Sequence, residues 1–331
     1  MSIVSYKNGH YQTEVGESVL DALLRHDINV PYACKAGVCQ VCVMQCQQGT
    51  ISSAATLGLK DSQVRDGNFI ACQCIPTENI IVQDADALGL FSQVKVIEKE
   101  NLATDICRIR MRTATDLYYR AGQFINLRMD NTEIRSYSLA SLPTRDDFLE
   151  LHVKRMRKGV VSNWLFSEVK TGDILDIQGP FGDCFYMPKN VEADILMIGT
   201  GTGLAPLIGI LREAIETGHK GQISLYHGEK DAKQLYLDEE LRSLAARHNN
   251  IQYFPCASSI YAPEAEGLYR GRASDLAFLS NPDLTGSLLY LCGSPSMVDE
   301  SRQQAQLNGA KLGDIYADPF VTKDLRLTVR Q

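Results

Sequence analysis

The cysteines of this 331-residue chain are unevenly spread, and their spacing restricts the possible folds more than any other feature. The N-terminus has no apolar signal sequence, and no apolar run reaches the ~18–20 residues of a membrane span. We therefore expect a soluble cytoplasmic protein, in which a disulfide framework is disfavoured. Six of the ten cysteines nevertheless fall within residues 34–74: Cys34, Cys39, Cys42, Cys46, Cys72 and Cys74. Such clustering points to metal ligation.

The first three clustered cysteines have the spacing C-x4-C-x2-C, which is found in plant-type [2Fe–2S] sites. A zinc ribbon fits less well, because 29 residues separate Cys42 from Cys72 and a single residue separates Cys72 from Cys74. A [4Fe–4S] run matches only in part, and buried free thiols are a third alternative. The fourth ligand is either Cys72 or Cys74.

The segments PYACKAGVCQVC and FIACQCIPTENI resemble a plant-type ferredoxin. In that family the closing cysteine lies four residues before a proline, and Cys72 has this relation to Pro76. The resemblance implies a [2Fe–2S] cluster on Cys34, Cys39, Cys42 and Cys72. It also implies a β-grasp domain over residues 1–88, with an Asn-Gly hairpin, a helix capped by Ser18 and a linker at residues 84–89.

Residues 92–190 change to a period-two pattern with turn signals, which predicts an antiparallel sheet or barrel. Three stretches in this region, in this order, resemble the FAD domain of ferredoxin–NADP reductase-like enzymes. The first is Arg135, Ser136, Tyr137 and Ser138; the second is Lys158, Gly159, Val160, Val161 and Ser162; the third is the turn at residues 179–182. A glycine turn into a helix N-terminus is suited to phosphate. The resemblance implies that the first two stretches bind FAD, with Ser138 near flavin N5.

Residues 191–331 begin with a continuous apolar run that leads into a glycine-rich turn and a helix, as in a doubly wound parallel-sheet fold. The turn is Gly199, Thr200, Gly201, Thr202 and Gly203, and a second strand-to-helix turn begins at Cys292 and Gly293. Both resemble the nucleotide domain of the same reductase family. The resemblance implies Cys292 near the nicotinamide and Phe320 against the flavin. These two residues and Ser138 are the predicted catalytic residues.

The residue after the second strand of such a domain usually meets the adenosine ribose, and here it lies in Gly228-Glu229-Lys230. The Glu229 carboxylate would repel a 2′-phosphate, whereas Lys230 would attract one, and on balance NADH is favoured over NADPH. Eleven residues follow Phe320, including Lys323, Arg326 and Arg330, and they form either a disordered end or a partner contact.

The three modules together resemble the reductase component of bacterial multicomponent oxygenases. The resemblance implies hydride transfer from NADH to FAD and single-electron transfer through the cluster to an oxygenase or hydroxylase component or its ferredoxin. The net charge of −7 argues against a nucleic-acid partner, and no membrane partner is expected. The alternatives are a reductase for a non-oxygenase acceptor, such as a deoxysugar dehydratase, and a non-catalytic redox or NADH sensor.

Overall fold

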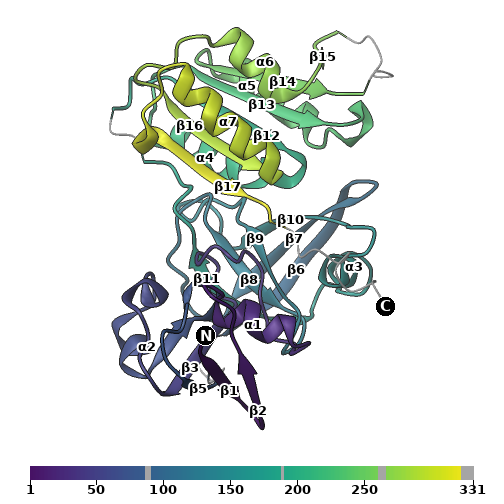
Figure 1. Ribbon diagram of the computed structural model, residues 1–331. Helices are drawn as coiled ribbons and strands as arrows, with labels where there is room; N and C mark the ends of the chain where they lie inside the picture. The colour runs from purple at the N-terminus through teal and green to yellow at the C-terminus, as the bar shows by residue number, and fades with distance from the viewer. Residues whose placement is uncertain (86–90, 188–189, 260–265, 322–331) are drawn as a thin grey trace.

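The chain forms three sheets in the computed structural model, which describes residues 1–85, 91–187, 190–259 and 266–321 (Figure 1). The predicted multidomain α+β and α/β architecture is confirmed. In Figure 1 the parallel sheet lies at the top, the antiparallel sheet in the middle and the N-terminal sheet at the bottom. In the described residues, no helix is both long and apolar enough to cross a membrane.

The N-terminal sheet has the order β2-β1-β5-β3-β4, in which β1 and β5 are parallel and the other pairs antiparallel. The predicted hairpin joins β1 and β2, and Ser18 caps helix α1 by accepting from the Asp21 N–H at 3.1 Å. Residues 29–42 between α1 and β3 contain no helix or strand, and residues 33–42 are called the cluster loop below. The elements are β1 (Ile3–Tyr6), β2 (Gly9–Gln12), α1 (Val19–Arg25), β3 (Val43–Gln48), α2 (Asp61–Arg65), β4 (Asn68–Ile70) and β5 (Ile80–Asp84).

The middle sheet is antiparallel, with the order β10-β7-β6-β11-β8-β9. A bridge between Leu139, just after β9, and Leu151 in β10 closes it into the expected barrel. Alternate side chains of its strands fill one apolar interior. The elements are β6 (Ser92–Ala103), β7 (Ile106–Thr113), β8 (Phe124–Arg128), β9 (Ile134–Ser138), β10 (Leu149–Lys154), α3 (Val160–Ser167) and β11 (Ile174–Phe181).

The C-terminal sheet is parallel throughout, with the order β15-β14-β13-β12-β16-β17. Helices α4 and α5 cover one face and α6 and α7 the other, each over its own apolar core, so the fold is doubly wound. The elements are β12 (Ile195–Thr200), α4 (Leu204–Glu216), β13 (Ile223–Glu229), α5 (Asp238–Arg247), β14 (Ile251–Ala257), β15 (Tyr269–Arg270), α6 (Ala273–Ser280), β16 (Leu288–Gly293), α7 (Pro295–Leu307) and β17 (Ile315–Pro319).

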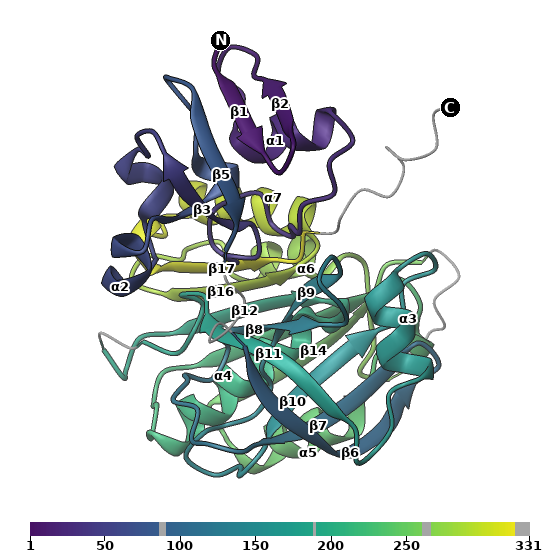
Figure 2. The ribbon, with the colours of Figure 1, turned by 90° about the horizontal axis from the view of Figure 1, so that it is seen from below.

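The barrel contacts both of the other sheets. The cluster loop packs on it through a small apolar core that includes Cys39, Val41, Phe124 and Ile134. The parallel sheet packs on it through a core that includes Tyr186. Figures 1 and 2 together show the N-terminal sheet beside the barrel at the end away from the parallel sheet. The predicted linker at residues 84–89 lies largely outside the described residues, as does the tail after Val321.

Candidate functional site

The four cysteines expected to hold the cluster meet as two pairs of thiols. Contact with the Cys39 thiol lowers the pKa of Cys34 to about 5 and raises that of Cys39. Contact with Cys42 lowers the pKa of Cys72 to about 7 and raises that of Cys42. Within the described ranges, no three His, Cys, Asp or Glu side chains converge on a point that could hold a single metal ion. Two pairs fit a two-iron cluster, in which each iron takes two thiolates.

Donors around these sulfurs support the same arrangement. The N–H groups of Ala36 and Cys39 point at Cys34 Sγ from 3.3 and 3.4 Å, and Gln73 Nε2 points at Cys72 Sγ from 3.4 Å. Such donors stabilise thiolates and tune the potential of a cluster. Gly37 has φ +81°, and a Cβ there would lie 2.8 Å from Gln73 Cγ, so a side chain would not fit.

The environments of Cys74 and Cys46 differ from that of Cys72, which pairs with Cys42. The Cys74 side chain is 1% exposed in the apolar core of the N-terminal sheet, where burial raises its pKa to about 12. The Cys46 thiol is directed to the carbonyls of Gln48 and Gly49. These positions support Cys72 as the fourth ligand, which stays a prediction.

Strand β9 carries the first predicted flavin stretch. The Arg135 guanidinium is partly exposed and pairs with Glu133 at 2.7 Å. Ser136 is exposed, and its hydroxyl donates to Asn126 Oδ1 at 2.8 Å. Tyr137 packs against the barrel interior, and Ser138 is buried. Successive side chains of a strand point to opposite faces, so Arg135 and Ser136 lie on the two faces of β9. The partly exposed guanidinium suits the anionic groups of FAD.

The second predicted flavin stretch is the turn into α3. Gly159 is the N-cap of this helix, and a Cβ there would lie 2.3 Å from Ser162 Oγ. The Ser162 hydroxyl accepts from the Met156 N–H at 3.1 Å and so fixes the turn. Lys158 and Val160 are exposed, whereas Val161 is buried. The exposed first turn of α3 suits a phosphate, because a helix N-terminus favours negative charge.

The two glycine-containing turns of the parallel sheet meet at the carboxyl ends of β12 and β16. A Cβ on Gly203 would lie 2.4 Å from the Cys292 carbonyl oxygen, and one on Gly293 would lie 2.3 Å from Thr200 Oγ1. The Ser294 N–H donates to the same Thr200 oxygen at 3.1 Å. The order of the strands reverses between β12 and β16, so this is the position at which doubly wound folds bind their ligands.

Glu229 ends β13 beside the glycine-rich turn, but its carboxylate has a partner that the sequence did not indicate. The Lys154 ammonium, from barrel strand β10, lies 3.2 Å from both carboxylate oxygens. Glu229 is 8% exposed, and burial raises its pKa. The expected contact between Glu229 and the adenosine ribose stays a prediction. If it forms, the Glu229 carboxylate binds both the ribose and Lys154.

Two of the predicted catalytic residues, Cys292 and Phe320, flank the end of β16. The Cys292 side chain is fully buried, its thiol lies 3.7 Å from that of Cys184, and burial raises its pKa well above the usual range. A buried thiol that stays protonated is unreactive. The position of Cys292 therefore supports a packing role beside the predicted nicotinamide site. Phe320 is partly exposed, and its N–H donates to the Gly293 carbonyl at 2.7 Å.

Asp318 was not assigned a role from the sequence. The Ser138 hydroxyl donates to its Oδ2 at 2.8 Å and so joins β9 to β17 across 180 positions of the chain. Burial raises the pKa of Asp318 to about 6, although the Ser138 hydrogen bond lowers it in part. The sequence signal was its place directly before Pro319 and Phe320; only the fold reveals its partner.

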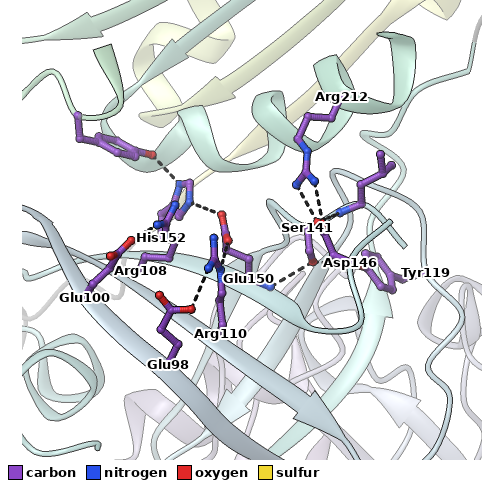
Figure 3. Close-up of polar contacts among 12 residues, drawn as sticks. Glu98, Glu100, Arg108, Arg110, Tyr119, Ser141, Asp146, Glu150, His152 and Arg212 are labelled. Carbon is purple, nitrogen blue, oxygen red and sulfur yellow. Dashed lines mark hydrogen bonds and ion pairs between the residues drawn. The ribbon is translucent and has the colours of Figure 1, made fainter. Parts of the chain in front are cut away.

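A buried polar network between the barrel and the parallel sheet was also missed (Figure 3). Glu150 accepts from Arg110 at 2.7 Å and from His152 Nε2 at 3.1 Å. On the other side, His152 Nδ1 lies 3.1 Å from the hydroxyl of Tyr236, which precedes α5. Burial lowers the pKa of His152, so its neutral ring donates to Glu150 and accepts from Tyr236.

A second connection in Figure 3 joins the barrel to helix α4. Both terminal nitrogens of Arg212 donate to Asp146, at 2.7 and 2.8 Å. The Asp146 carboxylate also accepts from the Leu142 N–H at 2.8 Å. Paired contacts of this kind fix orientation as well as distance. The network therefore fixes α4, and with it the glycine-rich turn that directly precedes this helix, relative to the barrel.

Three family models match the chain in the order of its sheets. A 2Fe-2S iron-sulfur cluster binding domain matches residues 5–77, an oxidoreductase FAD-binding domain residues 93–186, and an oxidoreductase NAD-binding domain residues 197–303. The fold and these matches define an oxidoreductase that carries an iron–sulfur module, an FAD module and an NAD module.

The chain belongs to the family of ferredoxin–NAD(P)+ reductase components of oxygenase systems. The reductase component of the naphthalene 1,2-dioxygenase system of Pseudomonas putida is 31% identical over 313 residues, and the match covers 92% of this chain and 94% of the relative. The aromatic O-demethylase reductase subunit of Amycolatopsis is 32% identical over 310 residues, with 89% and 91% covered. The solved structure of the Amycolatopsis cytochrome P450 reductase GcoB superposes with a TM-score of 0.69 at 29% identity, over 97% of this chain and 99% of that one.

Proposed function

We propose that this reductase takes a hydride from NADH onto FAD and passes electrons singly through the [2Fe–2S] cluster to the oxygenase or hydroxylase component of a multicomponent system, or to that system's ferredoxin. One observation carries the proposal: strand β9 is linked to both neighbouring modules. Ser138 donates to Asp318 of the NAD module, and Ser136 reaches the cluster loop through Asn126. The flavin strand thus lies between the electron source and the electron carrier.

Bound FAD supplies the conversion of a two-electron donor to one-electron steps, and the protein supplies binding, orientation and electrostatics. The turns at the ends of β12 and β16 hold the dinucleotide at the switch point. Ser138 and Asp318 hold a proton between their oxygens at the meeting of β9 and β17. Phe320 would cover the flavin from the NAD side. The paired thiols of the cluster loop and Cys72 would hold the two irons.

The proposed modules are residues 1–88, 92–190 and 191–331, which extend the matched segments to the surrounding turns. The proposed cluster ligands are Cys34, Cys39, Cys42 and Cys72. The proposed cofactor-binding residues are Arg135, Ser136, Tyr137, Ser138, Lys158, Gly159, Val160, Val161, Ser162, Gly199, Thr200, Gly201, Thr202, Gly203, Glu229, Cys292, Gly293 and Phe320. Of these, Ser138 and Phe320 are proposed to lie at the reacting atoms, and Cys292, also predicted as catalytic, is fully buried and is proposed to pack beside them.

The names of the relatives support an oxygenase-type acceptor, since they include reductase components of naphthalene dioxygenase and phenol 2-monooxygenase systems. We also propose a cytoplasmic location. In support, all ten cysteines, each of which lies in the described residues, are free thiols. Free thiols and a thiolate-bound cluster suit a reducing compartment.

The test is an anaerobic absorbance titration of the purified holoprotein with NADH, with NADPH as control. We expect stoichiometric NADH to bleach both the flavin and the iron–sulfur bands, and NADPH to act more weakly, as the predicted preference for NADH requires. Bleaching of the flavin alone would contradict transfer to the cluster. No bleaching with either nucleotide would contradict the proposed reductase activity itself.

A further inference from the structure

Asn126 of strand β8 makes a buried bridge between the barrel and the cluster loop. Its side chain is fully buried, and its Nδ2 donates to the carbonyl oxygen of Cys39 at 2.7 Å. Cys39 belongs to the N-terminal module, 87 positions earlier in the chain. The contact therefore joins a proposed cluster ligand to the barrel without using the thiol that the iron needs.

The other hydrogen-bond partners of the Asn126 amide come from the two strands that flank β8 in the barrel sheet. The same Nδ2 donates to Gln178 Oε1 at 3.0 Å, and Oδ1 accepts from the Ser136 hydroxyl at 2.8 Å. Ser136 and Gln178 lie directly opposite Asn126 on strands β9 and β11. An amide with both hydrogens and its oxygen engaged has one orientation, so the Cys39 carbonyl is held in one place relative to the flavin strand.

The surroundings of this bridge are apolar. Ala33 and Val41 from the cluster loop pack with Phe124 and Ile134 of the barrel, and all four are at most 9% exposed. Water is thus kept from the two hydrogen bonds that Asn126 donates, both of which are buried, whereas the Ser136 side is exposed. A polar bridge inside a dry contact fixes one docked arrangement, because every other arrangement leaves buried polar groups unpaired.

We propose that Asn126 is a positioning residue for electron transfer from the flavin to the cluster, holding the cluster loop on the strand that carries Ser136. This inference rests on the proposed function above. The residue touches neither the nucleotide turns nor a thiol, so it acts on the second transfer and not on the first. No sequence pattern singled it out, because its partners come from three separate segments.

The experiment compares Asn126→Leu with wild type as the FAD- and cluster-loaded full chain. Leucine has a similar size but donates nothing to the Cys39 carbonyl. After rapid anaerobic mixing with NADH, we expect unchanged bleaching of the flavin band and bleaching of the cluster band slowed about tenfold, equivalent to about 1.4 kcal/mol in the barrier. Amide hydrogen exchange of residues 33–42 is expected to rise, while that of β1 and β3 stays at the wild-type level.

Asn250→Leu is the matched control. The Asn250 amide also donates to two carbonyls, those of His219 and Gly221 at 3.0 Å each, but both lie within the NAD module. We expect this variant to transfer electrons to the cluster at the wild-type rate. A general loss of stability would slow both variants alike, whereas a positioning role slows only Asn126→Leu.

A second variant covers the case in which Asn126→Leu does not fold. Gln178→Met removes the second acceptor of the Asn126 amide and involves no residue proposed to bind a cofactor, and we expect a smaller slowing of cluster bleaching with the same change in hydrogen exchange. Transfer to the cluster at the wild-type rate in the variants that fold, with wild type itself bleaching both bands, would overturn the role of Asn126 and leave the proposed function intact. Failure of wild type to bleach its flavin would instead overturn the proposed function.

Discussion

The Lys154 ammonium lies 3.2 Å from each carboxylate oxygen of Glu229, and this ion pair joins the barrel to the nucleotide turn of the parallel sheet. The lysine side chain is 27% exposed, whereas that of the glutamate is only 5% exposed. Removal of the lysine therefore leaves a largely buried carboxylate without its partner. The pair links the nucleotide site to the docking of two modules.

We predict that Lys154→Met lowers the free energy of unfolding by about 1–3 kcal/mol, less than for a fully buried pair because the lysine is partly hydrated. Glu229→Gln should cost less, since the amide can still accept from Lys154. In the double variant the costs should not add, and a coupling of about 0.5–3 kcal/mol is expected from urea unfolding. Strictly additive effects would show that the pair contributes no coupling.

The two candidate closing cysteines give a second prediction. Cys72→Ser should yield protein without the normal cluster absorbance and electron paramagnetic resonance signal, because one iron loses a thiolate. Cys74→Ser should keep the cluster but lower the free energy of unfolding by about 1–3 kcal/mol, since a hydroxyl replaces a core thiol that is 1% exposed. A normal cluster in Cys72→Ser would refute the proposed ligand set.

A third prediction concerns the network between the barrel and the NAD module. Tyr236→Phe removes the hydroxyl that lies 3.1 Å from His152 Nδ1 and leaves that buried nitrogen unpaired. We expect a loss of about 1–3 kcal/mol in the free energy of unfolding, measured by urea denaturation. Tyr226→Phe is the control, because its 3.4 Å contact with Asn281 lies within the NAD module. Equal losses in the two variants would argue against a special role for the network.

Local patterns in the sequence were sufficient for the elements and for sites made by one segment. The Asn-Gly turn, the Ser18 cap and the glycine-rich turn after β12 all form where they were predicted. Each depends on neighbouring residues, whose backbone preferences and short-range hydrogen bonds act without the rest of the fold. The cysteine spacing is informative for the same reason, because three thiols come from one loop.

Local sequence patterns could not predict the contacts between modules. Asn126, Asp318 and Lys154 stand in strands whose patterns are ordinary, and their partners lie 75–180 positions away in the chain. A period-two pattern tells which face of a strand is buried but not which module covers it. The partner of Glu229 is the clearest case, since the sequence suggested a free carboxylate for a ribose.

The fourth prediction uses the raised pKa of Asp318, which is about 6 in the folded protein against an ordinary value of 3.8. Between these two values the folded state keeps a proton that the unfolded state releases. The free energy of unfolding therefore falls, through this group, as the pH rises from about 4 to about 6. Asp318→Asn removes this dependence and should be more stable than wild type at pH 7 by roughly 3 kcal/mol, with a difference below about 1 kcal/mol at pH 4.

Ser138→Ala supplies the opposing control for Asp318. It removes the hydrogen bond that lowers the pKa of this carboxyl, so the pKa in the folded variant should be higher than in wild type. The free energy of unfolding of the variant should therefore keep falling to a higher pH than that of wild type. Urea unfolding followed by circular dichroism from pH 4.5 to 7.5 measures all three proteins, and the other titrating groups cancel in the differences. Parallel pH profiles for wild type and Asp318→Asn would show that this carboxyl titrates at its ordinary pKa. In that case Asp318 would carry no proton above about pH 4, and the only proton in the contact would be that of the Ser138 hydroxyl.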